Sequence, residues 1–168
     1  MRGSANRSIF FWIIVGGFIA ATVDIGAAAL INWLSPAIIL RYIASGLVGS
    51  RALHLGTSGV VLGLLLQWLM GIIIAATFFL AALLVGRARL LSSGRWVAAA
   101  LAYGAVIFHY NVMPLSAIHR VPHFTLIRGI ENLLAMFLFA IIVALSARPA
   151  LLPGSQEATG LSSPPRRV

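Results

Sequence analysis

Long apolar runs alternate with short arginine-bearing segments along this chain. A helix needs roughly 20 apolar residues to cross the hydrocarbon core of a bilayer. Four runs approach or exceed that length, and they cover residues 9–34, 58–85, 96–113 and 127–147. The third run is the shortest, and Pro114 at its end cannot continue helical hydrogen bonding. The pattern predicts an all-α polytopic membrane protein, a bundle of four transmembrane helices.

The segment between the first two runs has a helical pattern of its own. Ser35 followed by Pro36 is typical of an N-cap and a first helical turn. A short helix is therefore predicted over residues 36–45, and we expect it to lie on the outer membrane interface or to dip back into the membrane. A glycine is a typical helix stop. The glycines that follow predict an end to the helix and then irregular backbone: Gly46, Gly49, Gly56 and Gly59.

The composition is that of a membrane-embedded chain. Of the 168 residues, 61% are hydrophobic and 9% are charged, whereas a soluble domain has about 25% charged residues. All 12 basic residues are arginine and there is no cysteine, which excludes disulfides and thiolate metal sites. Arginines that face the cytoplasm and anionic lipid explain the net charge of +9. Nucleic-acid binding is therefore not expected.

The arginines also predict how the chain lies across the membrane. Four spans place both termini on one side, which then carries eight arginines against four on the other side. Because positive residues collect in the cytoplasm, both termini are predicted to be cytoplasmic. Residues 1–8 form the N-terminal segment, and residues 148–168, rich in Pro, Gly and Ser, are predicted to be a disordered tail. Three tryptophans near run ends are expected at the membrane interface: Trp12, Trp33 and Trp96.

Polar residues inside the runs coincide with rows of small residues. Small residues spaced three or four apart let helices approach closely, and a charge that faces lipid at mid-membrane costs about 2.5–3.5 kcal/mol. We therefore expect the polar residues to point at neighbouring helices. The rows are Gly17, Ala21, Asp24 and Ala28 in the first run, Gly63, Gln67, Gly71 and Ala75 in the second, and Ala98, Ala102, Ala105 and His109 in the third.

These polar residues form a candidate intramembrane cluster. At a rise of about 1.5 Å per residue, Asp24 and Gln67 lie near the middle of the membrane, whereas His109 and Glu131 lie about 6–7 Å inside its outer face. Asn111 completes the set. If the fold gathers them, they form a polar path from the outer surface towards the membrane centre.

Each member of the cluster has a structural interpretation beside a functional one. Asp24 either bonds to Gln67, or is a neutral carboxyl in a dry interface, or binds a proton or a cation. Glu131 follows Arg128 by three residues, a spacing that supports ion pairing on a helix. His109 is either a ligand or proton relay, or an interface histidine. Metal-ligand spacing, nucleophile motifs and cofactor motifs are missing, so we expect no enzyme, metal site or cofactor.

Three stretches of the sequence carry a resemblance. Residues 16–46, GGFIAATVDIGAAALINWLSPAIILRYIASG, resemble the first half of small four-span bacterial inner-membrane proteins whose function is not characterised. NVMPLSA at residues 111–117 and ENLLAMFLFAIIVAL at residues 131–145 are similar to their second half. The resemblance covers most of residues 9–147 and implies a bacterial inner-membrane location with no assigned activity. The position of His109 is more often an amide residue in that family, which weakens a metal-binding role there.

Two functional hypotheses follow. Four helices make a thin bundle, so a solute pore through one copy is not expected. The first hypothesis is a non-enzymatic membrane component that binds lipid, partner proteins or its own copies, with Asp24 and Gln67 bonding helices together. The alternative is a small ion- or proton-coupled carrier that acts as a homo-oligomer, with Asp24 as the coupling carboxylate. Neither hypothesis names a small-molecule ligand.

Overall fold

The computed structural model describes residues 2–85, 93–109 and 126–151 of the chain. Within these ranges the chain is helical and contains no strand, so the all-α prediction is confirmed there. In chain order the helices are α1 (Arg2–Asn32), α2 (Pro36–Val48), the 3-10 helix η1 (Gly49–His54), α3 (Thr57–Val85), α4 (Ser93–Ile107) and α6 (Leu126–Leu151).

Among the described helices, three are long and apolar enough to cross a membrane. The spans cover Ile9–Asn32, Thr57–Val85 and Leu126–Pro149, and the shortest have 24 residues. A helix of that length measures about 36 Å, which exceeds the roughly 30 Å hydrocarbon core. α4 has 15 residues, about 22 Å, and part of the run predicted for it lies outside the described residues. The chain is thus a helical membrane protein with three candidate spans, and the fourth span stays a prediction.

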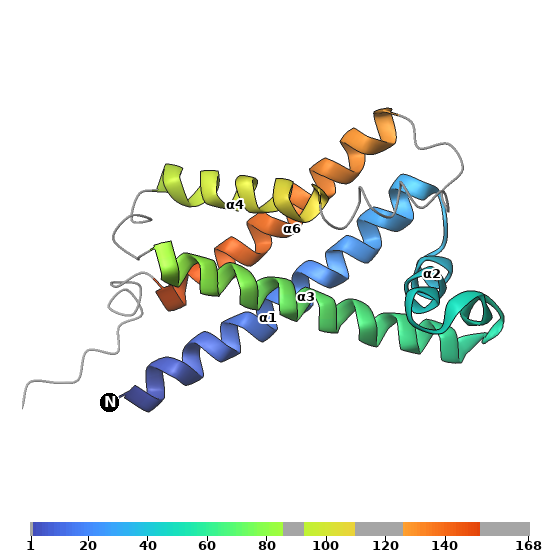
Figure 1. Cartoon of the computed structure of the whole chain (residues 1–168), viewed down its shortest axis with the longest axis horizontal. Coiled ribbons are helices and arrows are strands. Elements are labelled where there is room, and N and C mark those ends of the chain that lie inside the picture. Colours follow the sequence, from blue (N-terminus) through green and yellow to red (C-terminus); the bar gives the residue numbers. More distant parts are fainter. Residues whose placement is uncertain (1, 86–92, 110–125, 152–168) are drawn as a thin grey trace, which may run out of the picture.

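α1 lies in the middle of the helix arrangement (Figure 1). It packs against both α6 and α3, while α4 packs against α6, and α2 packs against α3. The helices α1, α3, α4 and α6 run in alternating directions, so the start of α1 and the end of α6 lie at the same end of the molecule.

One row of glycines on α3 contacts three other elements. A Cβ on Gly71 would lie 2.5 Å from the carbonyl oxygen of Gly17 in α1, and a Cβ on Gly59 would lie 2.6 Å from the carbonyl oxygen of Ala52 in η1. Gly63 lies between them in the sequence and packs still more closely, against the carbonyl of Leu40 in α2. These approaches leave no room for a methyl group. The small-residue row predicted on α3 is therefore an interhelical surface, which Gly59 extends by one turn.

The apolar core lies towards the end of the bundle that holds the start of α1 and the end of α6. Trp96 at the start of α4 is only 3% exposed. Its ring meets Phe78 of α3 edge to face, with centroids 5.8 Å apart, and its Nε1 donates to the carbonyl oxygen of Ala144 in α6 at 2.9 Å. Trp96 is near the end of a helix, as predicted, but its ring faces the bundle interior and joins three helices.

The face of α4 that packs against the bundle differs from the predicted one. Ala100 and Ile107 are buried, and a Cβ on Gly104 would lie 3.0 Å from the carbonyl oxygen of Met136 in α6. The prediction that the third small-residue row points at neighbouring helices of the chain is wrong. α4 carries alanine on every side, so small residues do not select a face, and the bulky Trp96 decides the orientation. The predicted row is exposed: Ala98, Ala102, Ala105 and His109.

The turn from α1 to α2 depends on the backbone of Trp33, whose φ of 54° lies in the left-handed region. The amide of Leu34 donates to the carbonyl of Ala29 at 3.1 Å, and the amide of Trp33 donates to the carbonyl of Leu30 at 3.3 Å. This is the Schellman pattern, in which the left-handed residue is usually glycine. Ser35 then takes the N-cap position of α2, as predicted; its side chain makes no capping hydrogen bond, and its carbonyl accepts from the amide of Ile39 at 3.2 Å.

Helix boundaries depart from the sequence prediction at three places. α2 continues through Gly46, where a stop was predicted, and ends before Gly49, whose φ of 72° is left-handed. A glycine ends a helix only where the chain adopts such a φ, and Gly46 stays helical. α1 is already helical from Arg2, within the predicted N-terminal segment, and α6 continues to Leu151, into the predicted tail. The rest of that tail lies outside the described residues.

Gly71→Ala should destabilise the protein because its Cβ would overlap the backbone of α1. Overpacking of this kind costs about 1–3 kcal/mol, and we expect that loss in the free energy of unfolding measured by SDS titration. Gly26→Ala is the matched control on α1, because a Cβ there meets nothing within 4 Å. The control should leave stability unchanged or raise it by about 0.5–1 kcal/mol. Equal effects of the two substitutions would contradict the proposed backbone contact.

Candidate functional site

Asp24 and Gln67 form a hydrogen bond between α1 and α3. The Gln67 Nε2 donates to the Asp24 Oδ2 at 2.8 Å. Both residues continue the small-residue rows that meet at Gly17 and Gly71. Because the two helices run in opposite directions, a residue after Gly17 meets a residue before Gly71. The close crossing therefore positions the two polar side chains opposite each other.

A second polar contact joins the same two helices. The Trp68 Nε1 donates to the Thr22 Oγ1 at 3.1 Å, and that hydroxyl donates in turn to the carbonyl of Phe18 at 2.8 Å. The ring of Trp68 lies 4.4 Å from that of Phe18, measured between centroids. Trp68 lies within the second apolar run, and the sequence analysis assigned no partner to it. A signal was present, because an indole N–H in the middle of an apolar run needs an acceptor, and Thr22 is the one hydroxyl residue in the first apolar run.

α4 is joined to α3 by a third polar contact. The Tyr103 hydroxyl donates to the carbonyl oxygen of Ile74 at 2.6 Å and also contacts the Thr77 hydroxyl. The Tyr103 ring lies 5.2 Å from that of Phe78, measured between centroids. This contact gives α4, whose main packing partner is α6, a polar anchor on α3.

Of the predicted polar cluster, the structure brings Asp24 and Gln67 together. His109 is exposed just beyond the α-helical part of α4, and Glu131 is half-buried near the start of α6. In the part of the chain that the structure describes, no hydrogen bond joins either residue to the pair formed by Asp24 and Gln67. Asn111 lies outside the described residues. A continuous polar path from the outer surface to this pair stays a prediction.

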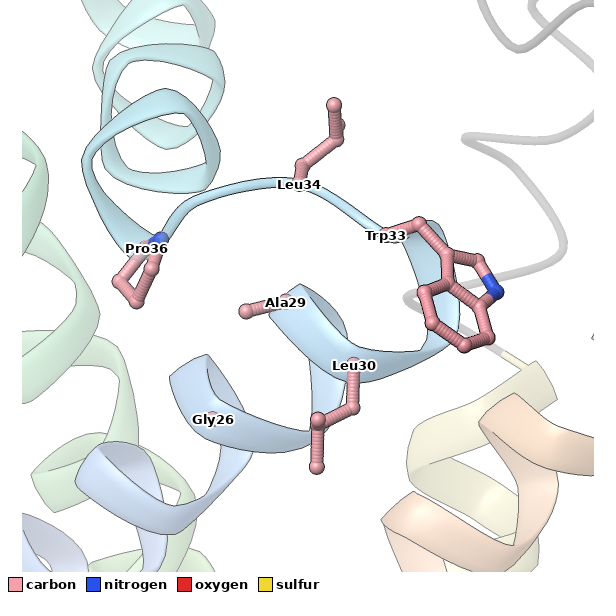
Figure 2. A pocket seen from close by; sticks show the side chains of 6 residues that line it. All are labelled: Gly26, Ala29, Leu30, Trp33, Leu34 and Pro36. Atoms are coloured by element: carbon pink, nitrogen blue, oxygen red, sulfur yellow. The ribbon is translucent and has the colours of Figure 1, made fainter.

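An apolar recess of about 480 Å³ opens beside the end of α1 (Figure 2). The methyl group of Ala29 points towards Pro36 across it, while the side chain of Leu34 points away. The indole of Trp33 supplies the one polar side-chain atom of the lining, so the recess suits an acyl chain or another apolar group. Its lining residues are Gly26, Ala29, Leu30, Trp33, Leu34 and Pro36.

Comparisons of the chain with models of protein families, with curated proteins and with solved structures find no significant match. The resemblance to four-span inner-membrane proteins therefore stays a prediction. The contacts described above carry the functional argument.

We expect the bond between Asp24 and Gln67 to be measurable in a double-mutant cycle. Asp24→Leu and Gln67→Leu should each destabilise the protein, and the double variant should lose less than the sum of the two. The coupling energy should be about 0.6–2 kcal/mol, the range of interhelical hydrogen bonds in membranes. Asp24→Asn is the control, because its amide oxygen still accepts from Gln67, and its stability should stay close to wild type. A coupling energy near zero would show that the bond does not stabilise the bundle.

Proposed function

We propose that this chain is a non-enzymatic membrane component that acts by binding lipid and further copies of itself. The proposal is supported by the partners of the intramembrane polar side chains, which are other helices of the same chain. Gln67 bonds to Asp24, and the side chains of Trp68 and Tyr103 also bond to neighbouring helices of the same chain. A solute-binding site inside a membrane instead needs polar groups that converge on a cavity.

The proposal includes a fourth span and an orientation. α4 together with the residues that follow it is the fourth span, and both termini are on the cytoplasmic side of a bacterial inner membrane. The alternating directions of α1, α3, α4 and α6 support four consecutive crossings, because each crossing reverses the chain. The excess of arginine on the side of the termini supports the orientation.

The outward face of α4 supports self-association. Ala98, Ala102 and Ala105 are exposed on that face and lie along one side of the helix at spacings of three and four. In lipid such a strip allows a second helix to approach closely, and van der Waals packing drives this contact. Within the described ranges this row of alanines is not packed against other helices of its own chain, and it is therefore available to pack against a second copy.

Ala102→Leu should weaken self-association several-fold, because a bulky side chain separates two helices that meet at this strip. The measurement is energy transfer between donor- and acceptor-labelled protein in liposomes across a range of protein-to-lipid ratios. Val97→Leu is the control, since Val97 is exposed on a different side of the same helix from Ala102 and is already large. If Ala102→Leu associates like wild type, α4 is not the contact surface.

The carrier hypothesis makes a different prediction for Asp24. A coupling carboxylate would have to exchange Gln67 for a proton or a cation during each cycle. We expect instead that vesicles containing wild type and Asp24→Asn show equal proton and cation flux, measured with an internal pH-sensitive dye and imposed gradients. A flux present in wild type and lost in a stably folded Asp24→Asn would replace the assembly proposal with the carrier.

A further inference from the structure

Arg41 in α2 carries a buried donor that lacks a partner. In the described part of the chain, its Nε is inaccessible to solvent and makes no hydrogen bond. A guanidinium stays charged in proteins, so it cannot escape this situation by losing a proton. A buried charged donor without an acceptor is unfavourable. Arg41 as a whole is only half-buried, so an acceptor from outside the chain can reach the accessible part of its side chain.

Arg41 lies where α2, η1 and α3 meet. Its Cγ is 3.5 Å from the position that a Cβ on Gly59 of α3 would take, and the carbonyl oxygen of Ala52 in η1 is 2.6 Å from the same point. That carbonyl already accepts from the amide of Leu55 at 3.3 Å. The stem of Arg41 thus packs over Gly59 of α3, beside the carbonyl of Ala52 in η1. The residue just before Ala52 is the exposed Arg51.

The charge of this junction is not balanced by the described chain. Residues 36–56 contain Arg41, Arg51 and His54 and no acidic residue. The acidic residues of the described part are Asp24 and Glu131. Asp24 accepts from Gln67, and no ion pair joins either carboxylate to Arg41 or Arg51. The junction is therefore complementary to an anion.

Large apolar side chains on the same segment identify the kind of anion. Several are exposed beside the arginines, although α2 itself is held against α3. A cationic segment with exposed apolar residues at the end of a membrane span lies at the boundary between headgroups and acyl chains. At that depth a phospholipid supplies both a phosphate and apolar chains. The exposed apolar residues are Ile38, Tyr42, Leu47, Val48 and Leu55.

We propose that the α2–η1 segment, residues 36–54, binds an anionic phospholipid, with the guanidinium groups of Arg41 and Arg51 holding its phosphate. Guanidinium groups suit phosphate because their planar donors bond to two oxygens at once. The acyl chains lie along the exposed apolar residues. This site deepens the proposed function, because it gives the lipid contact a place and a lipid class.

The test uses the full chain in detergent with three probes: short-chain phosphatidylglycerol, the matching phosphatidylcholine, and inorganic phosphate. Binding is measured by native mass spectrometry and by the shift in melting temperature. Phosphatidylglycerol should bind wild type and raise its melting temperature, and the other two probes should do so much less. Arg41→Gln and Arg51→Gln should each weaken phosphatidylglycerol binding about tenfold, as expected for one lost charged hydrogen bond.

Arg95→Gln is the matched control, because it removes the same charge from an exposed position at the start of α4. It should bind phosphatidylglycerol like wild type. Equal binding of phosphatidylglycerol and phosphatidylcholine, or wild-type binding by the Arg41→Gln/Arg51→Gln variant, would overturn the proposal. An equal response to inorganic phosphate would overturn the assignment to lipid and leave a free-anion site. Retained binding in Arg41→Gln alone would overturn the role assigned to Arg41.

Folding defects are separated from binding defects in two ways. Gln keeps the methylene groups that pack over Gly59, and circular dichroism reports the helix content of every variant. If Arg41→Gln does not fold, the exposed Arg51 carries the test. Energy transfer in liposomes of pure phosphatidylcholine reports self-association independently. Loss of lipid selectivity with normal self-association would end this proposal and leave the proposed function intact.

Discussion

Two helix backbones can touch only where neither carries more than a hydrogen atom or a methyl group at the point of contact. Gly17, Ala21 and Gly71 meet that condition where α1 crosses α3. Lipid is as apolar as the helix surfaces, so close packing and interhelical hydrogen bonds, instead of water exclusion, hold such a bundle together. The positions of the polar residues depend on this crossing, since a wider separation would move Gln67 out of reach of Asp24.

The hydrogen bonds between helices share a common arrangement. Each one lies beside a close or aromatic contact. Asp24 and Gln67 lie beside the glycine crossing, Trp68 lies over Phe18, and both Tyr103 and Trp96 lie next to Phe78. Packing brings the groups together, and the bond then fixes the rotation of one helix relative to the other. These polar side chains are consequently directed at neighbouring helices, while the outward faces of the spans present mostly apolar or small residues, with arginines beyond both ends.

Much of the α1–α3 pair could be predicted from sequence, because Asp24 and Gln67 mark the row of small residues that faces the neighbouring helix. The same reasoning failed on α4, where alanine occurs on all sides and Trp96 determines the packed face. The row containing His109 was therefore wrongly predicted to face inward. The left-handed Trp33 and the orphaned Nε of Arg41 had no sequence signal, since each arises from contacts made only after the helices meet.

The contact between α1 and α6 also fixes the order in which the bundle can be completed. Gly16 of α1 lies against Ser146 of α6, and these residues are separated by nearly the whole described chain. During synthesis, α1 enters the membrane long before α6 exists and must hold its glycine face towards lipid or towards a temporary neighbour. α3 arrives in the meantime and forms the first stable pair. The core around Trp96 then closes when α6 is inserted, so assembly finishes with the helix that is made last among those described.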